Sequence, residues 1–87
     1  METYQLFKFD SCPYCAMVRR FLDESGVEVE LQDILQDRDA HAALVAGGGS
    51  QQVPCLRIQR GEGAAAQVQW LYESADIIAY LQRAQAS

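Results

Sequence analysis

Two cysteines separated by two residues are the part of this sequence best suited to chemistry. They stand at positions 12 and 15 of the sequence Cys-Pro-Tyr-Cys, directly after a run of aromatic residues typical of a strand. A cysteine at the start of a helix lies beside free backbone N–H groups and the positive end of the helix dipole, which stabilise a thiolate. Pro13 suits the first turn, where its missing N–H is not needed. We therefore predict that Cys12 is a nucleophile and that Cys15, one turn further on, is the resolving thiol.

A zinc site is the alternative for the same thiols. Cys12, Cys15, Cys55 and His41 would supply a ligand set of the Cys₃His type. Structural zinc sites usually have two pairs of closely spaced ligands, whereas Cys55 and His41 each stand alone in the sequence. We therefore favour redox chemistry, expect no metal, and interpret His41 as a solvent-exposed helix residue.

Val53 and Pro54 form the second informative feature, at the entrance of a predicted strand. An X-Pro bond is cis in only about 5–6% of cases in folded proteins. Beside a reactive cysteine pair, a cis bond would turn the N–H and C=O of Val53 outward, where they can pair with an extended substrate. Cys55 follows directly, and we interpret it as a small buried hydrophobe. The alternative is a third reactive thiol near Cys12.

Glu73 and Ser74 open the last predicted helix. Ser74 is a suitable helix cap, and as a bare motif this is the favoured interpretation. The free N–H groups of a helix start also form an anion site. Ser74 and these amides would then hold a carboxylate while an acidic side chain holds a neighbouring ammonium, a combination that the α-amino acid end of a ligand presents.

Hydrophobic periodicity predicts the element order β-α-β-α-β-β-α. Strands are expected over residues 4–9, 27–31, 55–59 and 67–71, and helices over 12–24, 38–46 and from 74 onward. We expect Ser11 to cap the first helix, Gly26 to end it, and the glycines at 47–49 to begin a flexible loop. A right-handed crossover makes the first two strands parallel, and a hairpin turn at 61–63 makes the last two antiparallel. The prediction is an α/β fold with a four-stranded mixed sheet and helices on both faces.

Length and charge narrow the classes of function. Eighty-seven residues predict one domain over 1–87, and 49% hydrophobic residues are typical of a folded chain. Seven Lys and Arg against twelve Asp and Glu give a net charge of −5, which argues against nucleic-acid binding and a polybasic membrane anchor. The sequence has no apolar run of about 20 residues and no signal-peptide pattern, and its three cysteines do not fit a disulfide framework. We expect a cytoplasmic monomer that binds neither nucleic acid nor membrane.

Together these features resemble a glutaredoxin. The motif at 12–15 matches the redox motif of dithiol glutaredoxins, and Val53-Pro54 matches the cis-proline element of the family. Segments 6–15, 48–56 and 71–81 also resemble the N-terminal thioredoxin-fold domain of glutathione S-transferases, in particular glutaredoxin-like members and the membrane-associated prostaglandin E synthase type. The resemblance implies a thioredoxin-like fold over nearly the whole chain.

The resemblance also implies a function and a ligand. The protein would be a glutathione-dependent thiol–disulfide oxidoreductase acting on glutathionylated or disulfide-bonded proteins, with glutathione as reductant and Cys12 as the attacking thiol. The main chain of Val53 would pair with the glutathione cysteine, and Glu73 and Ser74 would hold the γ-glutamyl group. The remaining glutathione-binding residues that the resemblance implies are Tyr14, Gln52, Pro54 and Lys8.

One residue departs from the family pattern. Glutaredoxins commonly carry a lysine three residues before the first cysteine, where this sequence has Phe9, and Lys8 lies one residue earlier. A shift of one residue on a strand moves a side chain to the other face, so Lys8 contacts glutathione only if a bulge restores its direction.

Two other functions remain open. The protein would be a non-catalytic binder of glutathione, or of a glutathione-ligated iron–sulfur cluster held through Cys12. Pro13 disfavours the cluster, since cluster-binding relatives usually lack this proline. Isomerase or transferase chemistry on a lipid or electrophile is the third function, weakened because the sequence has no counterpart of the helical second domain of the transferases.

Overall fold

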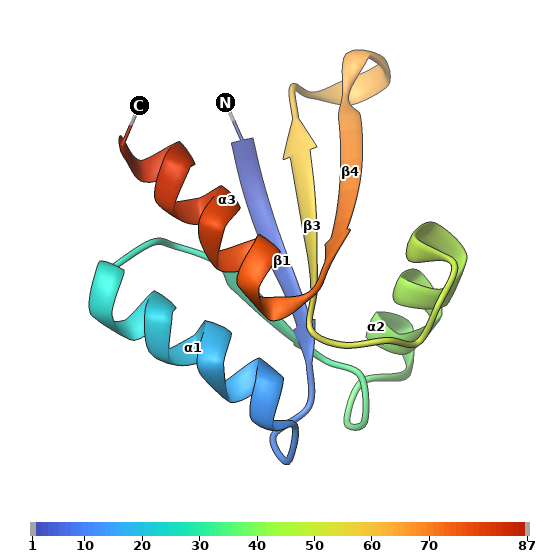
Figure 1. Cartoon of the computed structure of the whole chain (residues 1–87). Helices are drawn as coiled ribbons and strands as arrows, with labels where there is room; N and C mark the ends of the chain where they lie inside the picture. The colour runs from blue at the N-terminus through green and yellow to red at the C-terminus, as the bar shows by residue number, and fades with distance from the viewer. Residues whose placement is uncertain (1, 87) are drawn as a thin grey trace.

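The computed structural model describes residues 2–86 and contains a four-stranded sheet with helices on both faces (Figure 1). Along the chain the strands and long helices are β1 (Glu2–Lys8), α1 (Pro13–Ser25), β2 (Glu30–Asp33), α2 (Arg38–Ala43), β3 (Cys55–Arg60), β4 (Gln67–Tyr72) and α3 (Ser74–Ala86). A π-helical turn η1 (Leu44–Gly48) continues α2, and a short 3₁₀ turn η2 (Gly63–Ala65) lies in the hairpin between β3 and β4. The predicted element order and α/β class are confirmed.

The sheet has the strand order β2-β1-β3-β4. β1 runs parallel to β2 and antiparallel to β3, and β3 runs antiparallel to β4. The sheet is therefore mixed, as the crossover and hairpin predicted. None of the helices within residues 2–86 is long and apolar enough to cross a membrane.

The core has two parts because β1 is covered on both faces. Leu6 belongs to the cluster beneath α1 and α3, whose other buried members are Val18, Leu56, Ile58, Ile77 and Leu81. Phe7 faces the opposite way, into the cluster beneath α2 that also holds Ile34, Ala40, Leu44 and Cys55. Successive residues of one strand thus attach helices to opposite faces of the sheet.

The second strand begins later than the sequence predicted. The ladder between β1 and β2 begins at the pair Gln5–Glu30, so the alternating residues 27–29 lie before the strand. Gly26 ends α1 with a φ of 75°, and Val27 and Val29 then pack against the core from a coil. The prediction of a strand over 27–31 was therefore wrong for its first three residues, because alternation marked burial against helices rather than sheet pairing.

We predicted that Ser11 caps α1 and that Ser74 caps α3, but neither serine is the residue directly before its helix. Cys12 rather than Ser11 is the N-cap of α1, and its Sγ accepts the backbone N–H of Cys15 at 3.2 Å. α3 already includes Ser74, and its first backbone bond runs from the amide of Ile77 to the carbonyl of Glu73 at 3.0 Å. A sulfur atom therefore takes the capping role at the start of α1.

The loop predicted to begin at the glycines 47–49 begins at Gly49 rather than at Gly47, and Gly49 ends the turn η1 with a φ of 80°. Gly47 and Gly48 belong to the turn η1, which packs on β4. A Cβ at Gly47 would collide with the ring of Trp70, and one at Gly48 would collide with the hydroxyl of Tyr72. Only glycine allows this close approach.

Candidate active site

The register of the sheet gathers three distant segments at one end. Cys55 of β3 pairs with Phe7 of β1 and with Tyr72 of β4. The segments that follow β1, precede β3 and follow β4 therefore meet at this end of the sheet (Figure 1). They carry the cysteine motif at 12–15, the Val53–Pro54 pair and the Glu73–Ser74 pair.

Cys12 stands at the helix start with its sulfur turned back onto the helix. It is buried, with 6% of its surface exposed, and its Sγ lies 3.2 Å from the amide nitrogen of Cys15. Pro13 occupies the first helical position and offers no N–H. The next side chain, Tyr14, is 61% exposed beside the motif, where a ligand can reach its ring. The Cys12 sulfur thus lies beside the amide of Cys15, at the positive end of the dipole of α1.

Cys15 is fully buried beneath Cys12. Burial raises the pKa of the Cys15 thiol to about 12, and its hydrogen bond with Cys12 acts in the same direction. A hydrogen bond with the backbone of Phe9 and the positive charge of Lys8 oppose this rise in the pKa. The two thiols of the motif therefore have different environments. Cys12 caps α1, whereas the buried Cys15 stays protonated at neutral pH because of its raised pKa.

The peptide bond between Val53 and Pro54 is cis. Val53 is half-buried and Pro54 is buried at the entrance of β3. Within residues 2–86 neither the N–H nor the C=O of Val53 has a hydrogen-bond partner. The main chain of Val53 is thus available to pair with an extended ligand.

Glu73 follows the last residue of β4 and lies at the same end of the sheet. The side-chain amide of Gln52 donates to a carboxylate oxygen of Glu73 at 3.4 Å, which connects the segment before the cis-proline to the start of α3. The backbone of Glu73 has a φ of 70°, a left-handed conformation that non-glycine residues seldom adopt. Two of the residues predicted to bind one ligand are therefore adjacent in space.

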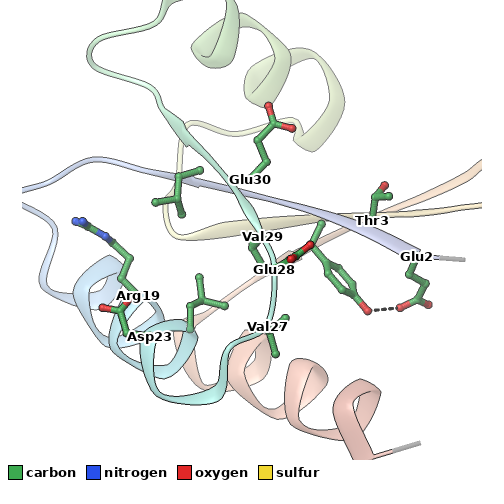
Figure 2. Close-up of a pocket in the computed structure, with 11 residues that line it drawn as sticks. Glu2, Thr3, Arg19, Asp23, Val27, Glu28, Val29 and Glu30 are labelled. Atoms are coloured by element: carbon green, nitrogen blue, oxygen red, sulfur yellow. Dashed lines mark hydrogen bonds between the residues drawn. The ribbon is translucent and has the colours of Figure 1, made fainter.

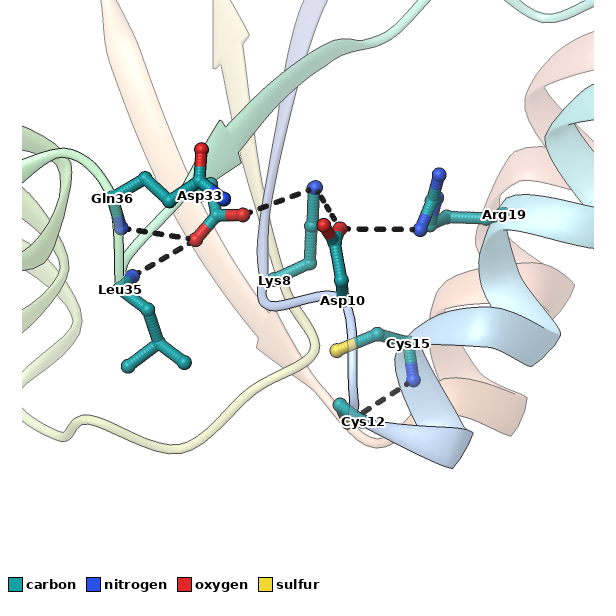
Figure 3. A network of polar contacts seen from close by, with 8 residues as sticks. All are labelled: Lys8, Asp10, Cys12, Cys15, Arg19, Asp33, Leu35 and Gln36. Atoms are coloured by element: carbon teal, nitrogen blue, oxygen red, sulfur yellow. Dashed lines mark hydrogen bonds and ion pairs between the residues drawn. The ribbon is translucent and has the colours of Figure 1, made fainter.

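Lys8 takes a different position from the other predicted glutathione-binding residues. It is 8% exposed, and its ammonium contacts Asp10 at 2.7 Å and Asp33 at 3.4 Å (Figure 3). The hydrogen bond to Asp10 raises the pKa of Lys8, against the opposing effect of burial, and Asp33 adds to the rise. The ammonium is thus engaged within the protein.

The two aspartates were not among the candidate residues. Asp33 is the register partner of Lys8 on β2. A second strand placed at 30–33 rather than at 27–31 reveals this pair. In the parallel register Gln5 pairs with Glu30, so three residues further along each strand Lys8 pairs with Asp33.

The third cysteine is part of the core. Cys55 is fully buried, and burial raises the pKa of its thiol to about 11, although a hydrogen bond with Tyr72 opposes the rise. His41 lies on α2 and its Nε2 is 3.2 Å from Oε1 of Gln51. In the part of the chain that the structure describes, no group of three or more His, Cys, Asp or Glu is arranged to hold a metal ion.

A separate cavity of about 890 Å³ lies between α1, the coil over residues 27–29 and the first half of β1 (Figure 2). Acidic side chains line much of it, among them Glu2, Asp23, Glu28 and Glu30, with Arg19 as the basic neighbour. None of the cysteines, Val53, Pro54, Glu73 or Ser74 borders it. The candidate active site is therefore defined by the thiols and the sheet end, not by this cavity.

The mixed four-stranded sheet, its flanking helices and the Cys-Pro-Tyr-Cys motif at a helix start define a protein of the thioredoxin-like fold. A sequence model of the glutaredoxin family matches residues 4–62. This match covers more than half of the chain, so the protein belongs to the glutaredoxin family. A search of curated proteins finds no match to the chain.

Solved structures share the fold at low sequence identity. The thioredoxin-like protein BC3987 superposes with a TM-score of 0.66 at 22% identity, over 93% of this chain and 97% of that one. The holo form of glutaredoxin C1 from Populus tremula x tremuloides gives 0.62 at 19% identity, over 95% and 77%. Glutaredoxin from Brucella melitensis gives 0.56 at 18% identity, over 93% and 79%. These likenesses concern the fold, and family membership supports a thiol–disulfide oxidoreductase role.

Proposed function

We propose that this protein is a glutathione-dependent dithiol oxidoreductase that reduces glutathione mixed disulfides and protein disulfides. The observation that carries the proposal is the position of the Cys12 sulfur at the N-cap of α1, 3.2 Å from the amide nitrogen of Cys15. The partial positive charge of a helix start favours thiolate over thiol, and the thiolate is the attacking species in disulfide exchange.

In the first step the Cys12 thiolate attacks the glutathionyl sulfur of a mixed disulfide. A bond forms between Cys12 Sγ and the glutathione sulfur, and the bond between that sulfur and the substrate breaks. The substrate leaves as a thiolate and takes up a proton from water. The disulfide-bonded sulfur of the substrate has then been reduced to a thiol, and Cys12 carries the glutathionyl group.

The Cys12 adduct is resolved in one of two ways. A second glutathione thiolate attacks the bound glutathionyl sulfur, which releases glutathione disulfide and restores the Cys12 thiolate. Alternatively Cys15 loses its proton and attacks Cys12 Sγ, which expels the glutathione thiolate and closes a disulfide between the two cysteines. Two glutathione molecules later reduce that disulfide and are themselves oxidised.

The end of the sheet that carries the Cys12 motif offers groups that suit each part of glutathione. The carboxylate of Glu73 suits the γ-glutamyl ammonium, while Ser74 and the free amides at the start of α3 suit the neighbouring carboxylate. The unpartnered N–H and C=O of Val53 suit the main chain of the glutathione cysteine. Three further predicted residues would complete the surface around the ligand, namely Gln52, Pro54 and Tyr14.

Lys8 has no part in this proposed glutathione site, because its ammonium is buried between two aspartates. We further propose that residues 1–87 act as one domain and as a monomer in a reducing, cytoplasmic compartment. These are the conditions in which glutathione serves as an electron donor.

The test is reduction of a glutathionylated protein by glutathione, coupled to glutathione reductase. We expect Cys12→Ser to abolish turnover and Cys15→Ser to keep part of it, because glutathione alone can resolve the Cys12 adduct. Cys55→Ala is the matched control, since it removes a thiol of the same protein that lies in the core. It should retain the activity of the unmodified protein.

Two results would overturn the proposal. Full activity of Cys12→Ser would show that Cys12 is not the nucleophile. Turnover that does not depend on glutathione would show that glutathione is not the reductant. A brown preparation with visible absorbance, lost in Cys12→Ser, would instead favour the binder of a glutathione-ligated iron–sulfur cluster.

A further inference from the structure

The beginning of α1 exposes apolar side chains on a face that is usually polar in a helix at the protein surface. The exposed residues there are Pro13, Tyr14, Ala16 and Met17. Tyr14 is 61% exposed and Met17 is 52% exposed. Further along the same helix the exposed residues are charged, namely Arg20, Asp23 and Glu24. The exposed apolar surface of α1 is therefore confined to the part of the helix that follows Cys12.

A groove of about 380 Å³ lies on this face, lined by Pro13, Ala16, Met17 and Arg20. These residues stand at the spacing i, i+3, i+4 and i+7, which places them on one side of the helix. The groove begins at the residue directly after Cys12.

The groove is separate from the groups that we assign to glutathione. Those groups come mainly from the segment before β3 and from the start of α3, whereas every residue that lines the groove belongs to α1. The groove is therefore a surface next to the reactive cysteine that the proposed glutathione site leaves open.

Arg20 gives the groove a charged end. Its side chain is exposed, and within residues 2–86 its guanidinium takes part in no hydrogen bond and no ion pair. The neighbouring Arg19 differs, because it contacts Asp10 at 3.5 Å. The chain has a net charge of −5, so the free guanidinium of Arg20 is a local feature that favours an acidic group over a basic one.

Met17 is the largest apolar side chain that lines the groove. A methionine side chain is unbranched and polarisable, so it adapts to apolar groups of different shape. The groove thus combines an adaptable apolar surface with one unpaired positive charge.

We propose that this groove binds the polypeptide of a protein substrate, and that it favours substrates with an apolar residue and an acidic residue beside the reactive cysteine. The inference rests on the proposed function and adds the class of substrate. The apolar side chain of the substrate packs on Ala16 and Met17, and its carboxylate pairs with Arg20.

The length of the helix sets the spacing in the substrate. Along the helix axis Met17 and Arg20 lie about 7.5 Å and about 12 Å from Cys12, at a rise of about 1.5 Å per residue. An extended chain rises about 3.3 Å per residue. The second residue from the substrate cysteine therefore reaches Met17, and the third or fourth reaches Arg20.

Three glutathionylated peptides of equal length test this spacing. The acidic peptide has leucine at the second position from its cysteine and aspartate at the third and fourth, on both sides, so that chain direction does not matter. The basic peptide has lysine in place of aspartate, and the polar peptide has serine in place of leucine. The mixed disulfide of free cysteine and glutathione is the reference substrate, because it has no neighbouring residues.

Arg20→Glu tests the charge. We expect the ratio of kcat/KM for the acidic peptide to that for the basic peptide to fall by roughly fivefold, the effect of an exposed ion pair of good geometry. Arg83→Glu is the matched control with the same change in net charge. Arg83 lies in the last turn of α3, near the contact of Gln85 with Ser25 at the far end of α1, so the ratio should hardly change.

Met17→Ser tests the apolar contact. We expect kcat/KM for the acidic peptide to fall by roughly fivefold, because about half of the methionine side chain is still available for burial. The polar peptide and the reference substrate should react as before. Leu35→Ser is the control, since it removes a side chain that is 70% exposed in the turn after β2.

Several outcomes would overturn the inference. An unchanged ratio in Arg20→Glu, or an equal change in Arg83→Glu, would show that Arg20 does not read the substrate. Equal losses of Met17→Ser on the peptides and on the reference substrate would show an effect on Cys12 instead of docking. Dimers that dissociate in Met17→Ser would assign the groove to a second copy of the chain. If the unmodified protein turns over none of the four substrates, the proposed function itself fails, which is a distinct result.

Discussion

The side-chain amide of Gln52 and the carboxylate of Glu73 lie 3.4 Å apart, although 21 positions separate them in the chain. The contact joins the segment before the cis-proline to the segment before α3. Both segments lie at the end of the sheet where β1 leads into the Cys12 motif, because Cys55 of β3 pairs with Phe7 of β1 and Tyr72 of β4. Within residues 2–86, the carboxylate that we assign to the γ-glutamyl ammonium thus has Gln52 as its one hydrogen-bond partner, and Glu73 remains exposed to a ligand.

Replacing Glu73 by glycine should stabilise the fold and weaken the binding of glutathione. The φ of 70° at Glu73 costs about 1 kcal/mol for a residue with a Cβ, and glycine adopts it without this cost. We expect Glu73→Gly to raise the free energy of unfolding in urea by about that amount and to raise the KM for glutathione. Glu73→Gln is the matched variant, which should raise the KM without the gain in stability. An unchanged KM in both variants would show that the carboxylate does not bind the substrate.

Native protein at neutral pH should react with iodoacetamide at one thiol. Cys15 and Cys55 are fully buried, and burial raises the pKa of their thiols to about 12 and about 11, so both stay protonated. We expect one adduct by intact mass, lost in Cys12→Ser, and three adducts after denaturation, one for each cysteine. An adduct mapped to Cys55 in the native protein would instead identify a third reactive thiol.

Alkaline pH should destabilise the protein through Cys55. Its pKa rises from 9.0 to about 11 on folding, so the folded state holds the proton more tightly than the unfolded chain. This contribution is complete below about pH 9 and is lost as the pH rises through the folded value, by roughly 2 kcal/mol at about pH 10.5. Urea denaturation at about pH 8 and about pH 10.5 measures the loss. Cys55→Val should lose less stability over this interval, and an equal loss would contradict the assignment.

Alanine at Gly48 should loosen η1 from β4. The added Cβ collides with the Tyr72 hydroxyl, which donates to the carbonyl of Gly48 at 2.9 Å. We expect a loss of about 1–3 kcal/mol in the free energy of unfolding, as overpacking typically costs. The cost should shrink in the Tyr72→Phe background, which removes the colliding oxygen. Ala46→Ser, at an exposed position of the same turn, is the control; equal losses in the two variants would show that packing on Tyr72 is not the cause.

Local patterns predicted the features that depend on neighbouring residues. The Cys-Pro-Tyr-Cys spacing predicted a helix start at 12–13, and α1 begins at Pro13. The αL end of this helix at Gly26 and the hairpin after β3 also followed from sequence. The strand over 27–29 did not form, because alternation of valines reports burial and does not distinguish a coil against helices from a paired strand.

The sequence alone determined the fold class and the cysteine pair, because helix starts, turns and strand periodicity are set within a few residues of chain. Only the tertiary structure decided which charges meet at the site. The pairing of Lys8 with Asp33 depends on a strand register that spans 25 positions, and the contact of Gln52 with Glu73 depends on two strands sharing one end. Such pairs arise from packing against distant elements, where a shift of one residue would turn each side chain to the opposite face.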